Sequence, residues 1–308
     1  MQLTIVPASS QVCQTAIRVL LSQDTSHTIV GIYRDPNKVP ADLKSHPNFR
    51  FIIGNLAERE TLDFSGSDAV LVTTPAAFTS TDVSAHIKCI TENVRSAIKR
   101  AGSVKRLVYV SSVGAQYHEG VGEVKSNHES ENVYRTVAPE VVFVRNSYFM
   151  DNWKPVFDTL KGDQPFFFST VVPTDFKIPM VSSRDIGETC AVKLLATGSG
   201  TREHPQIINL EGPERYSTTD VRIALESIIG KSIQVRSVEK DALPGFFGQV
   251  LPPHLVPEFV EMTTSMLPGG VLESEIRRIT DWKIGKESLL TALTHMWHEY
   301  LSRPVSSA

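Results

Sequence analysis

The chain has 308 residues, of which 41 % are hydrophobic and 21 % charged, and its formal net charge is −3. This balance is typical of a globular protein without a basic nucleic-acid surface, and no apolar run reaches the roughly 18 residues of a membrane-spanning helix. The cysteines Cys13, Cys89 and Cys190 are odd in number and far apart, which favours a reducing compartment and a core position for each. We therefore expect a cytoplasmic monomer or homodimer with neither a nucleic-acid nor a membrane partner.

Residues 1–150 alternate short apolar runs with helical patterns. Strands are predicted at 3–6, 28–33, 49–53, 69–73, 106–111 and 141–145, and helices at 11–22, after 58, at 83–101 and at 124–137. Continuous apolar runs such as 107–110 are typical of parallel strands buried on both faces. The alternation predicts an α/β fold with a Rossmann-like, doubly wound parallel sheet, whose ligands bind at the carboxyl ends of the strands.

After about residue 150 this rhythm changes and prolines become frequent. Helices are predicted at 185–195, from 217 to about 230, at 253–266 and at 286–301, with strands at 206–210 and 232–238. We expect residues 1–150 to form a dinucleotide-binding domain. Residues 151–308 are expected to form a smaller α/β substrate-binding region that is interleaved with it.

The turn after the first strand reads Pro7-Ala8-Ser9-Ser10-Gln11-Val12-Cys13. Dinucleotide-binding turns use glycines for tight turning, approach of the pyrophosphate and helix packing. Here Pro7, Ser10 and Cys13 occupy the positions of a G-x-x-G-x-x-G spacing. A helix N-terminus still offers N–H groups and a positive dipole end to phosphate. We expect the cofactor to be bound by Ser9, Ser10, Gln11 and Val12; the alternative is a turn that no longer binds anything.

The second strand ends in Tyr33-Arg34-Asp35-Pro36-Asn37-Lys38. An acidic residue at this strand end accepts from the ribose 2′-hydroxyl of NAD, whereas an arginine accommodates the 2′-phosphate of NADP. Arg34 comes first after the apolar run, and Lys38 is close behind. The pattern favours NADP(H) over NAD(H), the alternative being a solvated charged turn.

Three later strand ends carry polar or aromatic side chains. Thr73, Thr74 and Pro75 follow the fourth strand, Ser111 and Ser112 end the fifth, and 145–153 is an Arg-Asn pair followed by aromatic residues. The threonines and serines are expected to line the cofactor ribose. The aromatic residues form either a pocket wall or core.

A tyrosine and a lysine follow the fifth strand. Tyr117 and Lys125 are eight residues apart, not at the Y-x-x-x-K spacing that places both on one helical face. A lysine beside the nicotinamide ribose can hold the sugar and lower the pKa of a neighbouring hydroxyl, which then transfers a proton. The alternative for Lys125 is a surface ion pair with Glu129. Histidines, cysteines and carboxylates show no metal-ligand spacing, so no metal is expected.

Taken together, these motifs resemble those of the NmrA-like family of atypical short-chain dehydrogenases, over nearly the whole chain. The residues that carry the resemblance are 5–13 in register with GATGxxG, 33–36, Gly54-Asn55-Leu56 in place of GDL, 109–115, Lys125 with Glu129, 145–153 similar to RxGxFxxNW, 181–187, 211–213 and the helix at 261–263. The missing glycines and Asn55 in place of aspartate are departures from the family pattern.

The resemblance implies an NADP(H) cofactor held by the turn and Arg34, with Lys125 near the nicotinamide ribose. We also assign Asn55 and Tyr148 to the cofactor site, and a catalytic role to Lys125, Ser112 and Tyr117. The function expected is an NADP(H)-dependent oxidoreductase acting on an apolar small molecule, in fungal secondary-metabolite (alkaloid or polyketide) biosynthesis. A non-redox isomerase or cyclase on the same fold, and an NADP(H)-sensing regulatory protein, are the alternatives.

Overall fold

The computed structural model describes residues 1–23, 27–75, 78, 80–196 and 204–302. The chain forms two compact units. Unit 1 comprises residues 1–119, 124–146 and 186–209, and unit 2 comprises 120–123, 147–185 and the residues from 210 on. Unit 1 thus includes a segment, 186–209, beyond the expected boundary at residue 150.

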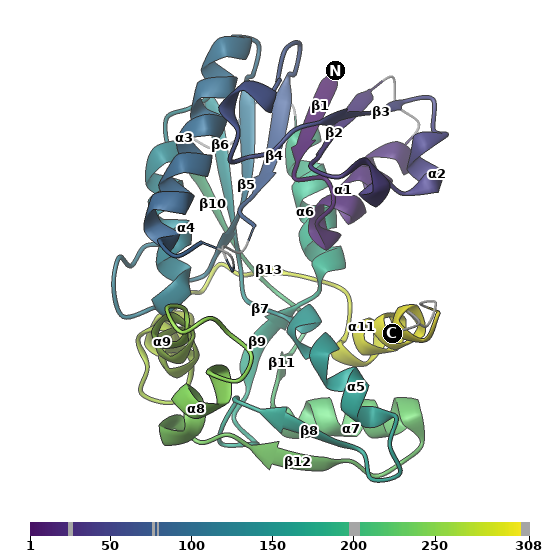
Figure 1. Ribbon diagram of the computed structural model, residues 1–308, viewed down its shortest axis with the longest axis vertical. Helices are drawn as coiled ribbons and strands as arrows, with labels where there is room; N and C mark the ends of the chain where they lie inside the picture. Colours follow the sequence, from purple (N-terminus) through teal and green to yellow (C-terminus); the bar gives the residue numbers. More distant parts are fainter. Residues whose placement is uncertain (24–26, 76–77, 79, 197–203, 303–308) are drawn as a thin grey trace. The chain divides into compact units, whose positions relative to one another are not determined.

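A sheet of parallel strands forms the centre of unit 1 (Figure 1). Its strands are β1 (Gln2–Val6), β2 (Thr28–Tyr33), β3 (Phe49–Ile53), β4 (Ala69–Thr73), β5 (Arg106–Ser112), β6 (Glu140–Asn146) and β10 (Gln206–Glu211), in the order β10-β6-β5-β4-β1-β2-β3. Strands β1 to β6 pair in parallel. The strand order reverses between β1 and β4, so the predicted doubly wound fold is confirmed. A short strand, β13 (Lys283–Ile284), pairs with the last two residues of β10, which belong to unit 2.

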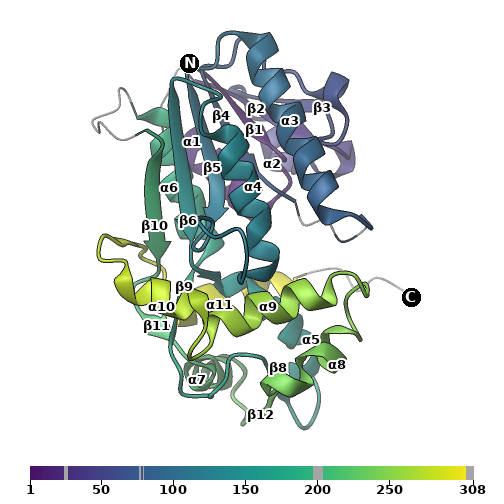
Figure 2. The same cartoon turned by 90° about the vertical axis from the view of Figure 1, so that its left-hand side faces the viewer.

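Helices cover both faces of this sheet. They are α1 (Gln11–Ser22), α2 (Ala41–Lys44), α3 (Val83–Ala101), α4 (Lys125–Tyr134) and α6 (Ser183–Leu195). Helices α3 and α4 lie side by side on one face, and α1 and α6 lie on the other (Figures 1 and 2). At Gly187 of α6, an added Cβ would lie 2.6 Å from Cβ of Thr15, so only glycine lets α1 and α6 pack this closely.

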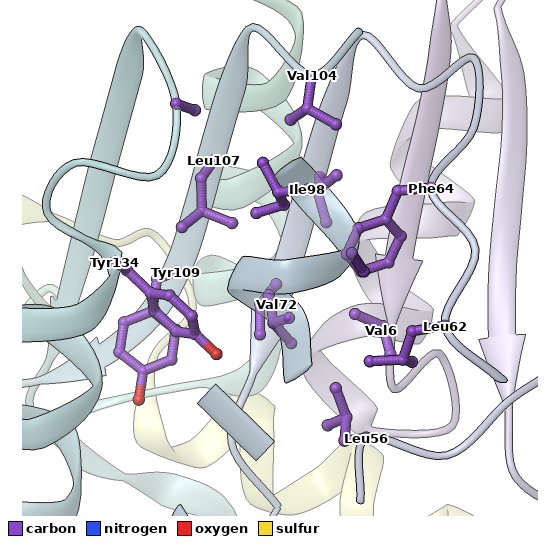
Figure 3. Close-up of a cluster of buried hydrophobic side chains, with 14 of the residues drawn as sticks. Val6, Leu56, Leu62, Phe64, Val72, Ile98, Val104, Leu107, Tyr109 and Tyr134 are labelled. Carbon is purple, nitrogen blue, oxygen red and sulfur yellow. The ribbon is translucent and has the colours of Figure 1, made fainter. Parts of the chain in front are cut away.

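The core between the sheet and α3 is made of apolar residues from both (Figure 3). Val72 and Leu107 come from β4 and β5, and Ile98 comes from α3; all three are buried. Tyr109 of β5 and Tyr134 of α4 meet edge to face, with ring centroids 5.1 Å apart. Burial of such apolar side chains is the main stabilising term in folding. It therefore fixes both helices on the strands whose ends carry the predicted site.

Two expectations about burial are wrong. Strand β3 was expected to be buried on both faces, but Phe51 and Ile53 are 39 % and 51 % exposed, because β3 is the edge strand. Cys89 is exposed on α3, whereas Cys13 and Cys190 are buried as predicted. The predicted helix at 124–137 is also shorter: a 3-10 turn at Gly122–Val124 precedes α4, and α4 ends at Tyr134, three residues early.

Unit 2 has smaller sheets and its own core. Its strands are β7 (Tyr148–Phe149), β8 (Phe166–Ser169), β9 (Ile178–Val181), β11 (Arg215–Tyr216) and β12 (Gln234–Ser237), in the sheets β11-β9-β7 and β12-β8. Its helices are α5 (Phe157–Leu160), α7 (Thr218–Ile229), α8 (Leu243–Phe247), α9 (Val256–Met266), α10 (Val271–Arg278) and α11 (Leu289–Leu301). Trp153, Phe157 and Leu293 lie in the core. Most of the short strands, together with α8 and α10, were not predicted.

The last helix begins three residues later than predicted. Asp185 accepts hydrogen bonds from the backbone N–H groups of Lys286 and Glu287, at 2.9 and 3.0 Å. The hydroxyl of Ser288 then accepts from the N–H of Thr291 and caps α11. A contact between residues about one hundred positions apart thus determines where α11 starts.

Candidate functional site

The carboxyl ends of the strands of unit 1 lie at one edge of the sheet. Val6 of β1 lies opposite Val72 of β4, and Ser112 of β5 lies opposite Asn146 of β6. This register brings the turn after β1, the segment after β2, Thr73 to Pro75 and the Ser111-Ser112 pair to the same edge. The edge includes the reversal between β1 and β4, where open α/β sheets bind their ligands.

The turn after β1 caps helix α1 with its own residues. The hydroxyl of Ser10 accepts from the N–H of Cys13 at 3.2 Å, and the N–H of Ser10 bonds to the carbonyl of Pro7. The first amides of a helix have no intrahelical acceptor, and this cap satisfies only that of Cys13. The N–H groups of Gln11 and Val12 therefore remain as donors for an anion. Ser9 is exposed, and the hydroxyl hydrogen of Ser10 is still available for donation.

Close packing beneath this turn is provided by a glycine on β2. A Cβ added at Gly31 would come within 2.8 Å of the Tyr33 ring and 3.1 Å of Cβ of Ala8. The N–H of Ala8 also donates to the carbonyl of Ile32, at 2.8 Å. Burial raises the pKa of the Cys13 thiol and of Tyr33 to about 12, so both are neutral near pH 7. The turn has lost its glycines but not its close contact with the sheet.

Two cationic side chains stand at the end of β2. Arg34 and Lys38 are both exposed. The carboxylate of Asp35 accepts from the N–H of Asn37 at 2.9 Å and so caps the 3-10 turn Pro36–Lys38. The acidic group at this strand end is therefore engaged by its own turn, while the arginine faces solvent. The arrangement suits a 2′-phosphate better than a 2′-hydroxyl.

Asn55 shapes the turn after β3. Its side-chain oxygen accepts from the N–H of Ala57 at 3.1 Å, and its side-chain nitrogen donates to Glu58 at 2.9 Å. An ionised aspartate has no hydrogen to donate to Glu58, which is a physical reason for asparagine at this position. The contact of Asn55 with a cofactor remains a prediction.

A tyrosine that the sequence did not single out connects the end of β4 to α4. The hydroxyl of Tyr109 lies 2.8 Å from that of Thr74 and accepts from the side chain of Asn127 at 3.1 Å. Burial raises the pKa of Tyr109 to about 12. This phenol therefore stays neutral and fixes Thr74; Thr73 is half-buried and Pro75 is exposed at the same strand end.

A buried ion pair lies beside the end of β5 and was also missed. Arg145 donates to both carboxylate oxygens of Glu131, at 2.9 and 2.6 Å, and to the side-chain oxygen of Gln116 at 2.9 Å. The hydroxyl of Ser111 donates to Glu131 at 2.6 Å. The one hydrogen that Ser111 can donate is thus used within the protein. The available signal was a charged residue at the end of an apolar strand, which when buried needs a partner.

The three predicted catalytic residues follow one another along the chain from the end of β5 to the start of α4. Ser112 is half-buried and donates to the carbonyl of Val113 at 3.1 Å. Tyr117 is half-buried in the following turn, and Lys125 is the first residue of α4. Glu129, the alternative partner of Lys125, accepts a hydrogen bond from Ser84 of α3 at 3.0 Å.

Tyr148 belongs to unit 2, unlike the other predicted cofactor residues. It is half-buried in β7, opposite Met180 of β9, and its ring centroid lies 6.2 Å from that of Trp153. Burial raises the pKa of Tyr148 to about 12. Trp153 is buried in the core of unit 2. For Trp153, the interpretation as a core residue is therefore favoured over the interpretation as a pocket wall.

Two features are absent from the part of the chain that the structure describes. No helix there combines the length and the apolar character needed to cross a bilayer. Nor does that part contain a group of three or more histidine, cysteine or acidic side chains placed to hold a metal ion.

Solved structures share this fold at low sequence identity. The NADPH-dependent quinone oxidoreductase of Escherichia coli, in complex with NADPH, is 18 % identical, with a TM-score of 0.72 over 96 % of this chain and 100 % of that one. Citrobacter sp. triphenylmethane reductase, in complex with NADP(H), is 17 % identical, with a TM-score of 0.70 over 97 % and 99 %. The negative transcriptional regulator NmrA is 16 % identical, with a TM-score of 0.63 over 98 % of both chains.

None of the curated protein sequences compared with the chain matches it. The family model described as NAD(P)H-binding matches residues 8–170, more than half of the chain. With the shared fold of NmrA, this match confirms the predicted resemblance to NmrA-like atypical short-chain dehydrogenases. The matched residues include the turn after β1 and the β5–α4–β6 edge. The chain therefore belongs to the NAD(P)H-binding family.

Proposed function

We propose that this protein is an NADP(H)-dependent reductase of an apolar, conjugated small molecule. The observation that carries the proposal is the pair of exposed cations, Arg34 and Lys38, at the end of the strand next to the α1 N-terminus. The N–H groups of Gln11 and Val12 suit a pyrophosphate, and the cations suit a 2′-phosphate. A role in secondary metabolism remains a prediction, as does the substrate-binding role of residues 151–308.

The chemistry of the site follows from its side chains. A bound reduced nicotinamide supplies a hydride to an electron-poor acceptor. Lys125 is proposed to hold the ribose hydroxyls next to that ring. Ser112, Tyr117 or water delivers the proton where the acceptor needs one. The protein thus contributes mainly orientation of the two reactants and exclusion of competing water.

The cofactor part of the proposal is tested by calorimetric titration with NADPH, NADP⁺ and NADH. We expect NADPH to bind more tightly than NADH, and Arg34→Ala to weaken NADPH at least tenfold while leaving NADH within about twofold, which corresponds to the loss of one charge-assisted contact. Arg50→Ala removes an exposed arginine near the amino end of β3 and serves as the charge-matched control. Equal weakening by both variants would contradict the 2′-phosphate role of Arg34.

The reductase part is tested with two acceptors that differ in proton demand. 1,4-Benzoquinone accepts a hydride and one proton to give the hydroquinone, whereas the cation malachite green accepts a hydride alone to give its colourless form. We expect NADPH consumption matched to acceptor reduction. Tyr117→Phe or Ser112→Ala should slow the quinone reaction about 10²-fold or more, and the dye reaction much less, if that hydroxyl supplies the proton. NADPH binding without any turnover would instead support the sensing role.

A further inference from the structure

We infer that Glu131 and Arg145 are positioning residues, which hold the helix of Lys125 and the turn of Tyr117 in one fixed frame. The inference rests on the proposed function, because it assigns these residues a role in setting the groups that would orient the cofactor. Neither side chain is placed in contact with a ligand. Both are buried, at 1 % and 8 % exposure.

One guanidinium group connects three chain segments. Arg145 lies at the end of β6, opposite Ser111 of β5. Its Nε and Nη2 atoms donate to Glu131 of α4, and its Nη1 donates to Gln116 in the turn just before Tyr117. Glu131 in turn accepts from Ser111. One hydrogen-bonded group thus ties α4 both to the strand end and to the turn.

Helix α4 has no side-chain cap at its N-terminus. The residue before Lys125, Val124, has helical backbone angles and no side chain that caps the helix. The helix is held instead by hydrogen bonds from its side chains to the sheet and to the turn after β5. Asn127 donates to Tyr109, and a ring nitrogen of His128 lies 2.9 Å from the carbonyl oxygen of Ala115. Glu131 is the buried, charged member of this set.

A second ion pair on the same two strands provides a matched control. At the amino ends of β5 and β6, Arg106 bonds to Glu140, its register partner. Glu131→Gln and Glu140→Gln are the same substitution, and each removes the negative charge of a glutamate that is paired with an arginine. They differ in the end of the strand pair that they disturb.

The experiment is a double-mutant cycle with Lys125→Ala, read out as kcat for malachite green reduction and as the dissociation constant of NADPH. Glu131→Gln is expected to lower kcat about 10²-fold, as a small misplacement of catalytic groups does. If Glu131 acts through Lys125, Lys125→Ala combined with Glu131→Gln should be no more than about threefold worse than Lys125→Ala alone. Glu140→Gln should stay within about twofold of wild type and add independently to Lys125→Ala.

Thermal melting establishes that each variant is folded at the assay temperature. If Glu131→Gln is not, Arg145→Lys takes its place, because lysine keeps the charge beside Glu131 but cannot reach Gln116 with the same fork. The positioning role would be overturned if the losses in kcat of Lys125→Ala and Glu131→Gln multiplied in the double variant. Equal effects of Glu131→Gln and Glu140→Gln would also overturn it. Failure of wild type to reduce either acceptor would overturn only the reductase proposal, because the double-mutant cycle read out as the dissociation constant of NADPH would still test the positioning role. Wild type that binds no NADPH would overturn both.

Discussion

The two ends of the β5–β6 strand pair each carry an arginine–carboxylate pair, but the pairs join different things. At the amino end, Arg106 and Glu140 sit on adjacent strands, and the Glu140 side chain is 28 % exposed. Arg106 also donates to the carbonyls of Leu194 and Ala196 at the end of α6. At the carboxyl end, Arg145 reaches Glu131 on a helix, and the Glu131 side chain is 1 % exposed.

The difference follows from what the backbone already fixes. Strands β5 and β6 are joined along their length by the hydrogen-bond ladder, so a side-chain pair between them adds little order. Helix α4 has no such ladder to the sheet, and its direction depends on side chains. The carboxyl edge, where α/β folds bind ligands, thus has the pair that fixes a helix. The amino edge has a pair that reinforces existing contacts.

The largest expected effect is on stability at the carboxyl end. Glu131→Gln leaves the guanidinium of Arg145 buried without its counter-charge, and breaking a buried pair from one side costs about 3–5 kcal/mol. We expect this loss in the free energy of unfolding, measured by urea denaturation with an unchanged m-value. A loss below about 1 kcal/mol would mean that water reaches Arg145 and that the pair is not an anchor.

The next effect is on stability at alkaline pH and concerns Tyr109, which lies on β5 and contacts Asn127 of α4. Its pKa is about 12 in the folded protein against about 10 in the unfolded chain, so folding favours the protonated phenol. This contribution is complete below pH 10 and is lost as pH rises from 10 to 12, by at most about 2.7 kcal/mol. Urea titrations at pH 8 and 11 should show a smaller loss for Tyr109→Phe than for wild type. An equal loss would assign the alkaline sensitivity to other buried tyrosines.

A smaller effect is expected at the hydroxyl of Ser111. Ser111→Ala removes one donor from Glu131 but leaves both bonds from Arg145 in place. A hydrogen bond to a charged group contributes about 1.5–3 kcal/mol, so we expect a loss of about 2 kcal/mol in the free energy of unfolding. Combined with Glu131→Gln, the two losses should be less than additive, because both remove the same bond. Full additivity would contradict a shared network.

The sequence predicted the sheet but not the ion pair. Buried parallel strands are continuous apolar runs, and the residue that follows such a run, as Arg34 follows β2, is readily found. Helix α4 is strongly polar and carries both Glu129 and Glu131, two residues apart. The sequence does not say which of the two is the buried partner of Arg145. That depends on the register that places Ser111 opposite Arg145. Exposure of β3 and the start of α11 likewise depend on which segments meet in space.

The smallest expected effect is at the amino end. Glu140→Gln removes a partly solvated carboxylate from Arg106, whose side chain is 8 % exposed but keeps two carbonyl acceptors, so the expected loss of unfolding free energy is about 1 kcal/mol. Because charges near solvent are screened by salt, the loss should shrink between low and 1 M sodium chloride, whereas that of Glu131→Gln should not. Urea denaturation at both salt concentrations measures this. Equal salt dependence would mean that both ends are equally solvated, and the contrast between a reinforcing pair and an anchoring pair would no longer hold.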